Sequence, residues 1–169
     1  SICQLFCGST SRPVISIDWS DLDDHKAHFL LRAAISLKGR PVTLYQEVHC
    51  NKTKEKPASH KAFLKALHAM LPSNCRPIIV TDAGYKSPWF REVLALGWDI
   101  VGRVRKPHFY SLDSGNTWQC IRHLYAQATS RPKRFDNSQI ARGNPFACTL
   151  VLFKQKAKGR HASNPDGTR

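Results

Sequence analysis

The sequence predicts an α/β protein, with a mixed sheet whose later strands alternate with helices and a β-rich segment that follows. Three observations predict this class. Apolar and polar residues alternate over short runs near the start of the chain, which is typical of half-buried strands. Helical spacing then alternates with short, continuous apolar runs. Apolar residues make up 41% of the 169 residues, enough for a packed core.

The first strands are predicted from alternation and from turn residues. Residues 13–18 alternate apolar and polar side chains, which predicts a strand that ends on a carboxylate. A second extended run, 28–37, is followed by a third at 42–48. The leucines and alanines of the second run would also suit a helix, but Gly39 and Pro41 between the runs favour a hairpin. We therefore expect three consecutive strands, antiparallel to one another.

The following elements alternate between helix and strand. Three-and-four spacing of apolar residues predicts a helix that begins near Pro57 and stops at Pro72. The continuous apolar run 77–82 is typical of a strand buried in the middle of a sheet. A second helix is expected over 88–96, with Pro at its start and Gly just after its end, and a further strand over 98–104.

The predicted order is therefore β-β-β-α-β-α-β. An antiparallel meander followed by strands linked through right-handed helical crossovers is what the RNase H-like fold requires. Beyond Lys106 the chain changes to short strand-like runs with Gly and Pro between them. We expect the first part of an RNase H-like catalytic core over 1–106, a β-rich insertion after the fifth strand over 107–155, and a basic linker or truncated tail over 156–169.

The charge of the chain indicates its class of partner. Lys and Arg number 26 against 12 Asp and Glu, a net charge of +14. Residues 1–51 hold five basic and five acidic side chains, so the whole surplus lies in 52–169, with 21 basic and seven acidic. Lysines that merely solvate the surface are the alternative, but so one-sided an excess favours nucleic acid as the partner.

The remaining composition indicates a cytoplasmic, nucleoid-associated protein. The six cysteines form no CxxC pair, and the chain shows no secretory signal and no apolar run of transmembrane length. The Cys and His residues near the start match no zinc-finger or ribbon spacing: Cys3, Cys7, His25, His28, His49 and Cys50. The chain opens without Met and closes on a polar stretch, so we expect a fragment of a longer protein or a decayed copy.

Two aspartates, Asp18 and Asp82, end two of the predicted strands. In the expected topology these strands are neighbours, so their carboxylates could converge at one edge of the sheet. Carboxylates in such a site hold Mg²⁺ or Mn²⁺, and a pair of these ions can stabilise both the attacking and the leaving oxygen of a phosphoryl displacement. An aspartate at a strand end is also a common turn former or helix cap, and this alternative stays open.

The sequence around both aspartates carries a family resemblance. Asp18 lies in Ile15-Ser16-Ile17-Asp18-Trp19-Ser20-Asp21, and Asp82 in Thr81-Asp82-Ala83-Gly84-Tyr85-Lys86-Ser87-Pro88-Trp89-Phe90. With 96–98 and 101–105, these segments closely resemble the bacterial insertion-sequence DDE transposases of the branch historically called family four, which cut and paste mobile elements through DNA hairpins. The resemblance runs from about residue 10 to about residue 160 and is most specific over 76–105.

The resemblance implies an RNase H-like domain in which Asp18 and Asp82 are the first two catalytic, metal-binding carboxylates. It implies Mg²⁺ or Mn²⁺ as cofactor, with two ions in the intact parent. It further implies double-stranded DNA, the inverted-repeat ends of a transposon, as the substrate. A homodimer of the intact parent is possible, and no membrane is involved.

One feature of that family is missing. Its third ligand is a glutamate after the insertion, on a helix with a Tyr, Arg, Glu, Lys signature, and no such signature occurs here. Glu92 is the only glutamate after Asp82, and it lies on the helix just after that aspartate. Asp21, Asp23 and Asp24 could lend a further carboxylate, although a solvated acidic turn is the better interpretation. We expect the fragment alone to be inactive, because such constellations lose most of their power when one member is missing.

Clusters of basic side chains are the candidate DNA contacts, because such clusters grip phosphates. Near the proposed site and in the insertion these are Lys86, Arg103, Arg105, Lys106, Arg131, Lys133 and Arg134. The alternating basic residues of 154–160 suit a linker as well as a DNA track. Trp89, Trp98 and Trp118 could stack on a base, although aromatic residues beside Ile, Val and Leu usually belong to the core.

Two functions remain at this point. The first is a fragment of a DDE transposase that performs metal-dependent phosphoryl transfer on DNA. The alternative is a noncatalytic, basic nucleic-acid-binding module in which Asp18 and Asp82 are structural. Metal dependence separates the two.

Overall fold

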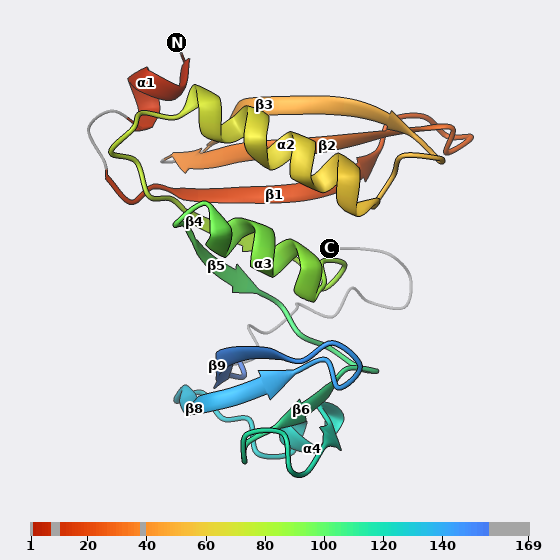
Figure 1. Cartoon of the computed structure of the whole chain (residues 1–169), viewed down its shortest axis with the longest axis vertical. Helices are drawn as coiled ribbons and strands as arrows, with labels where there is room; N and C mark the ends of the chain where they lie inside the picture. The colour runs from red at the N-terminus through yellow and green to blue at the C-terminus, as the bar shows by residue number, and fades with distance from the viewer. Residues whose placement is uncertain (1, 8–10, 38–39, 156–169) are drawn as a thin grey trace, which may run out of the picture. The chain divides into compact units, whose positions relative to one another are not determined.

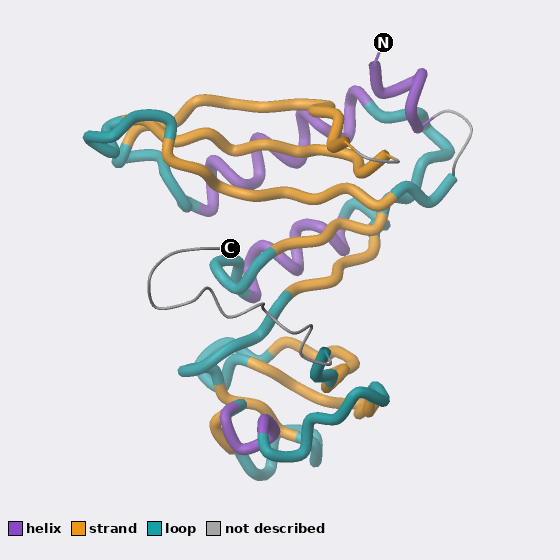
Figure 2. Tube along the Cα trace, turned by 180° about the vertical axis from the view of Figure 1, so that it is seen from behind, coloured by secondary structure: helices purple, strands orange, loops and turns teal. Residues whose placement is uncertain are grey.

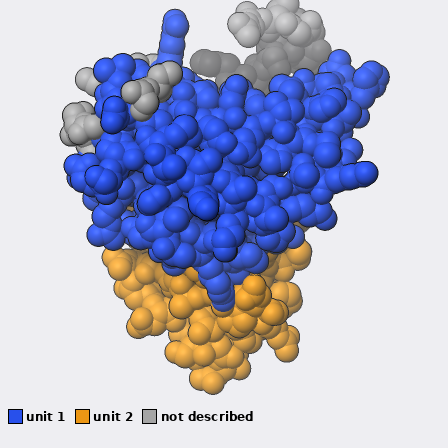
Figure 3. Space-filling view, turned by 45° about the horizontal axis from the view of Figure 1, so that its top comes forward, with its two compact units in different colours: residues 1–104 blue, residues 105–169 orange. Residues whose placement is uncertain are grey.

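The structure is a computed structural model that describes residues 2–7, 11–37 and 40–155 (Figure 1). The chain forms two compact units, residues 1–104 and residues 105–169 (Figure 3). The first unit contains the elements α1 (Ile2–Cys7), β1 (Val14–Asp21), β2 (His28–Leu37), β3 (Arg40–Cys50), α2 (Pro57–Met70), β4 (Ile78–Thr81), α3 (Ser87–Ala95) and β5 (Asp99–Gly102).

The first unit is built on a mixed sheet of five strands in the order β3-β2-β1-β4-β5. β2 is antiparallel to both β1 and β3, whereas β4 is parallel to both β1 and β5. The predicted meander and the predicted mixed α/β sheet are therefore confirmed. Part of the expected turn between β2 and β3, residues 38–39, lies outside the described residues.

Both long helices of this unit cover the same face of the sheet. Seen from one side, α2 and α3 lie in front of the strands (Figure 1), and seen from behind, the strands lie in front of the helices (Figure 2). Ile15 and Ile17 of β1 and Phe63 and Leu67 of α2 are at most 1% exposed, so the core lies between the helices and the sheet. The intervening residues of β1 are exposed, as alternation along a strand requires.

Local signals account for where these two helices begin and end. Each has a proline within its first two positions, where the missing N–H costs no hydrogen bond, and neither has a side-chain cap. After α3, Gly97 adopts a φ of +73° and donates its N–H to the carbonyl of Leu94 at 2.9 Å. This left-handed residue ends the helix where the sequence predicted a glycine cap.

The second unit contains β6 (Phe109–Ser111), β7 (Gln119–Cys120), α4 (Arg122–Tyr125), β8 (Lys133–Ile140) and β9 (Phe146–Leu152). Its four strands form an antiparallel sheet in the order β7-β6-β8-β9. The β-rich character predicted for this part of the chain is confirmed. The basic tail expected over 156–169 lies outside the described residues, and no helix in the described part of the chain is both long and apolar enough to cross a membrane.

Three elements were not predicted. α1 is short and begins at the second residue, and α4 has only four residues, so neither shows a helical period. β8 reads Lys-Arg-Phe-Asp-Asn-Ser-Gln-Ile, and its pairing with β9 shifts register between Phe135 and Ser138. A bulge with polar residues on both sides interrupts the alternation by which a strand is recognised.

Substitution of a buried and of an exposed leucine tests this core. Leu67 of α2 is fully buried, whereas Leu94 of α3 is 46% exposed. We expect Leu67→Ala to lower the free energy of unfolding by about 2–5 kcal/mol, because it removes buried methyl groups and leaves a cavity. Leu94→Ala should change it by no more than about 0.5 kcal/mol. Urea denaturation measures both, and equal losses would contradict the placement of the core.

Candidate functional site

The two aspartates occupy equivalent positions on neighbouring parallel strands. β1 pairs with β4 in a register that sets Ile17 beside Thr81, so Asp18 and Asp82 are the next residue on each strand. Asp18 lies within β1, and Asp82 follows β4 directly. Parallel strands expose their carboxyl ends at the same edge of a sheet, and both side chains belong to that edge.

Each carboxylate is held by a nearby backbone amide. The N–H of Trp19 donates to Oδ1 of Asp18 at 2.9 Å, and the N–H of Gly84 donates to Oδ1 of Asp82 at 2.8 Å. A Cβ on Gly84 would lie 3.1 Å from this same Oδ1, so glycine allows the turn after β4 to close on the carboxylate. Within the described residues no hydrogen bond reaches Oδ2 of either aspartate, and these oxygens can accept a cation.

The electrostatics of the pair favour a bound cation. Burial raises the pKa of Asp18, the hydrogen bond from Trp19 partly opposes this, and the negative charge of Asp82 raises it further. The charge of Asp82 thus disfavours a second negative charge at Asp18, and a positive ion beside them would relieve this. The donor set therefore fits Mg²⁺ or Mn²⁺ in kind, since both ions prefer carboxylate oxygens and Mg²⁺ is bound in many proteins through one or two carboxylates.

The described residues contain no group of three His, Cys, Asp or Glu side chains able to hold a metal ion. The other acidic residues named from the sequence have different partners. Asp21 lies 3.6 Å from Lys26, Asp23 accepts the backbone N–H groups of residues 27 and 28, and Glu92 pairs with a lysine of α2 at 3.5 Å. Asp23 is therefore a turn-forming residue, as the interpretation of an acidic turn required.

An aromatic cluster lies on the helix side of the two aspartates. The imidazole of His60, on α2, contacts the ring of Trp19, which follows Asp18, and the ring of Tyr85, three residues after Asp82. It also contacts Trp89 of α3 edge-on, with ring centroids 5.0 Å apart. The predicted site did not include His60, because it lies far along the chain from both aspartates and no acidic residue is its neighbour. The helical period alone places it beside the sheet.

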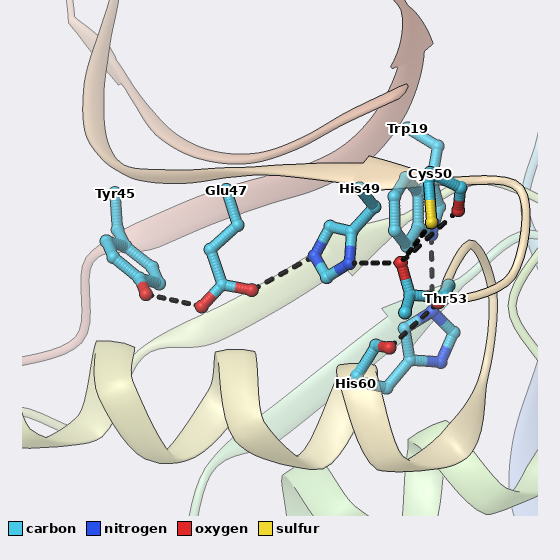
Figure 4. Close-up of polar contacts among 8 residues, drawn as sticks. Trp19, Tyr45, Glu47, His49, Cys50, Thr53 and His60 are labelled. Carbon is cyan, nitrogen blue, oxygen red and sulfur yellow. Dashed lines mark hydrogen bonds and ion pairs between the residues drawn. The ribbon is translucent and has the colours of Figure 1, made fainter. Parts of the chain in front are cut away.

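A chain of polar contacts runs along β3 beside this cluster (Figure 4). The hydroxyl of Tyr45 donates to Oε1 of Glu47, and Nε2 of His49 lies 3.0 Å from the other oxygen of that carboxylate. Nδ1 of His49 lies 3.2 Å from the hydroxyl of Thr53, in the loop that leads to α2. Its ring meets Trp19 edge-on at 5.0 Å. The indole is therefore flanked by two histidines.

The predicted DNA-contacting residues are divided between the two units. Lys86, just before α3, and Arg103, just after β5, are exposed in the first unit, as are Asp18 and Asp82. In the second unit the exposed residues are Arg105, Lys106, Arg131, Lys133 and Arg134, and the last of these pairs with Asp136 at 2.8 Å. Trp89 and Trp98 are at most 3% exposed and belong to the core.

The cysteines and histidines near the start of the chain, whose spacing matches no zinc site, have separate contacts. Cys3 and Cys7 are buried, and the nearby Cys75 contributes to a rise in the pKa of Cys7 to about 11, of which burial is the main cause. His49 contacts Glu47 and Thr53, and Cys50 contacts Thr53 at 3.8 Å.

This geometry defines a two-carboxylate, candidate metal-binding site on a mixed α/β sheet. Over residues 10–158 the chain matches the family described as transposase DDE domain. It belongs to this family, which confirms the predicted relationship to DDE transposases.

No curated protein matches the chain. Among solved structures it is similar to the one titled "Structural characterization of the Ppx/GppA protein family: crystal structure of the Aquifex aeolicus family member", at 13% identity and a TM-score of 0.28. That match covers 83% of this chain and 51% of the other, so this chain spans about half of that protein. A similarity this weak carries no argument.

Acid titration tests the environment of His60. Burial, and to a lesser extent the charge of His49, lower the pKa of His60 from 6.5 to about 4. Between these values the unfolded chain binds a proton that the folded chain does not, so stability should fall as the pH falls from 6.5 to 4. His60→Gln should reduce this dependence, as measured by urea denaturation across that range. Identical pH profiles for the two proteins would contradict the buried, neutral imidazole.

Proposed function

We propose that this chain is part of a cut-and-paste DNA transposase with an RNase H-like core, which performs metal-dependent phosphoryl transfer on the ends of its mobile element. The observation that carries the proposal is the placement of Asp18 and Asp82. They are adjacent positions on neighbouring parallel strands, within the region that matches the transposase DDE domain family.

In this function Asp18 and Asp82 would hold Mg²⁺ or Mn²⁺ through their carboxylate oxygens. Divalent ions between two carboxylates stabilise the attacking and leaving oxygens of a phosphoryl displacement. The residues of this chain supply orientation. The amides of Trp19 and Gly84 each fix one carboxylate oxygen, and Oδ2 of each aspartate is left to bind. The aromatic cluster packs the residues next to these carboxylates, Trp19 and Tyr85, against α2 and α3.

The chain alone should lack strand-cleavage activity. Among the described residues no group of three His, Cys, Asp or Glu side chains could hold a metal ion, so no third ligand joins the proposed pair. A third carboxylate would fix the position of a second ion and the direction of attack, and such groups act as a unit. The intact parent is then the active species, with two ions and, in this proposal, two copies acting on paired DNA ends.

The basic residues account for binding to double-stranded DNA. In the first unit Lys86 and Arg103 lie at the same edge of the sheet as the aspartates. Lys86 follows the turn after β4, and Arg103 comes directly after β5, which is parallel to β4. In the second unit Arg131, just before β8, and Lys133, its first residue, are exposed. Positive side chains at these positions would hold phosphates by charge, independently of base sequence.

A noncatalytic nucleic-acid-binding module is the second candidate. The lack of a third ligand among the described residues favours it, whereas the net charge of +14 suits both candidates. Both candidates bind DNA, but only the transposase requires a divalent ion at Asp18 and Asp82.

Titration with Mn²⁺ separates the two functions. We expect saturable Mn²⁺ binding to the wild-type chain, by calorimetry or proton relaxation, and its loss in Asp18→Asn and Asp82→Asn, since an amide oxygen lacks the negative charge that holds the ion. Asp99→Asn is the matched control, because Asp99 lies at the opposite end of the β4–β5 pairing and forms an ion pair with Arg12 at 2.6 Å. If both variants bind Mn²⁺ as the wild-type chain does, the transposase function fails and the noncatalytic DNA-binding module remains.

The salt dependence of DNA binding tests the basic residues of the second unit. Combined replacement of Arg131, Lys133 and Arg134 by Gln should weaken binding to duplex DNA of any sequence. The slope of log K against log salt should become shallower by about 0.9 for each phosphate that the variant no longer neutralises. Lys61, Lys65 and Arg76 of the first unit, replaced together, remove equal charge and serve as the control. Equal effects of the two triple variants would show that only net charge matters.

A further inference from the structure

His60 joins the two aspartate-bearing segments of the candidate site. It lies near the start of α2, and Nε2 of its ring accepts the indole N–H of Trp19 at 3.2 Å (Figure 4). The opposite segment reaches the same ring, because Tyr85 stacks on it with centroids 5.5 Å apart and planes inclined by 29°. One imidazole therefore contacts the residue after Asp18 and a residue in the turn after Asp82.

Trp19 is held on its other side as well. The ring of His49 meets the indole edge-on, at an interplanar angle of 68°. His49 is itself fixed between the carboxylate of Glu47 at 3.0 Å and the hydroxyl of Thr53 at 3.2 Å. The indole is therefore held by contacts with two histidines, His60 and His49. The backbone of Trp19, which donates to Oδ1 of Asp18, is positioned by it.

Tyr85 provides the corresponding link to Asp82. It follows Gly84, whose N–H holds Oδ1 of Asp82 at 2.8 Å. The phenol is 4% exposed and packs between His60 and Trp89, with centroids 4.7 Å from the latter. Burial and then the charges of Asp18 and Asp82 raise the pKa of Tyr85, so it remains protonated close to both carboxylates. Displacement of this ring would move the turn that carries Asp82.

The chemistry of the histidine is specific to this position. Nε2 can accept the indole proton only while it is unprotonated, and the buried ring is neutral near pH 7 because its pKa is lowered to about 4. A leucine would fill the same volume among the rings but would leave the indole N–H without its acceptor. The indole is half-buried, and without this acceptor it would lose the hydrogen bond that orients it and would turn toward another partner.

We propose that His60 is a positioning residue of the candidate site, which holds Asp18 in place through Trp19 and Asp82 through Tyr85. The expected effect of His60 on metal affinity rests on the proposed metal-dependent function. The positioning itself is a property of the metal-free chain. Residues that orient metal ligands from behind commonly change affinity by about 10–100-fold when they are replaced.

The test uses two independent readouts on the full chain. The first is hydrogen exchange, by NMR, of the amides of Trp19 and Gly84, which donate directly to the two carboxylates. Their protection is compared with that of Ile17, a core residue of the same strand, so that global destabilisation is removed. The second readout is the dissociation constant for Mn²⁺. The variants are His60→Leu, which removes the acceptor, and His60→Gln, which restores an acceptor oxygen.

His60→Leu should lower the relative protection of both amides and weaken Mn²⁺ binding by about tenfold or more. His60→Gln should recover most of both. His68→Leu is the matched control, since His68 lies on the same helix but contacts Trp98 instead, and it should change neither readout. If His60→Leu does not fold, Trp19→Phe removes the same hydrogen bond from the other partner and should lower the protection of the residue 19 amide.

Unchanged amide protection and unchanged Mn²⁺ affinity in a folded His60→Leu would overturn the proposal and leave His60 a packing residue. If His60→Gln loses as much amide protection and Mn²⁺ affinity as His60→Leu, the hydrogen bond to Trp19 has no positioning role. If the wild-type chain binds no Mn²⁺, the proposed metal-dependent function fails. The amide protection then decides the positioning role by itself, since it is measured without metal.

Discussion

The first unit depends on the parallel pairing of β1 with β4. This pairing joins the antiparallel meander to the helix-linked strands, and without it the sheet would divide into two parts. Its register sets Ile15 beside Ile79, both fully buried, so a slip by one residue would turn these side chains out of the core. The same register places Asp18 beside Asp82. Packing of the hydrophobic core therefore fixes the geometry of the candidate site.

Much of this fold could be predicted because its signals are local. Strand alternation, the three-and-four spacing of α2, and proline and glycine at helix ends each act within a few residues. α1 could not be predicted, because its two buried cysteines pack against a segment after α2 that lies far along the chain. β8 was not predicted from the sequence, because Asn137, at a φ of +56°, lies in the bulge that breaks the alternation of this strand. Tertiary contacts determine both elements.

The candidate site also combines residues that the sequence predicted with one that it did not. Asp18 and Asp82 could be named from the sequence, because each ends an apolar run and lies in a motif similar to those of a known family. His60 could not, since its role depends on contacts with Trp19 and Tyr85 across 41 and 25 positions of the chain. The helical period places His60 on the sheet-facing side of α2, but nothing in the sequence indicates which rings it contacts there. Only the packing of α2 against the sheet reveals it.

Two adjacent carboxylates are unfavourable without a positive charge, and the structure shows how the fold accommodates them. Each has one oxygen bound by a backbone amide, which stabilises the charged form, while burial and the neighbouring charge act against that form at Asp18. The aromatic cluster behind them is assembled by α2 and α3, whose packing is part of the core. The amide contacts that orient both aspartates therefore form within the first unit, on or just after the same strands whose register the core fixes.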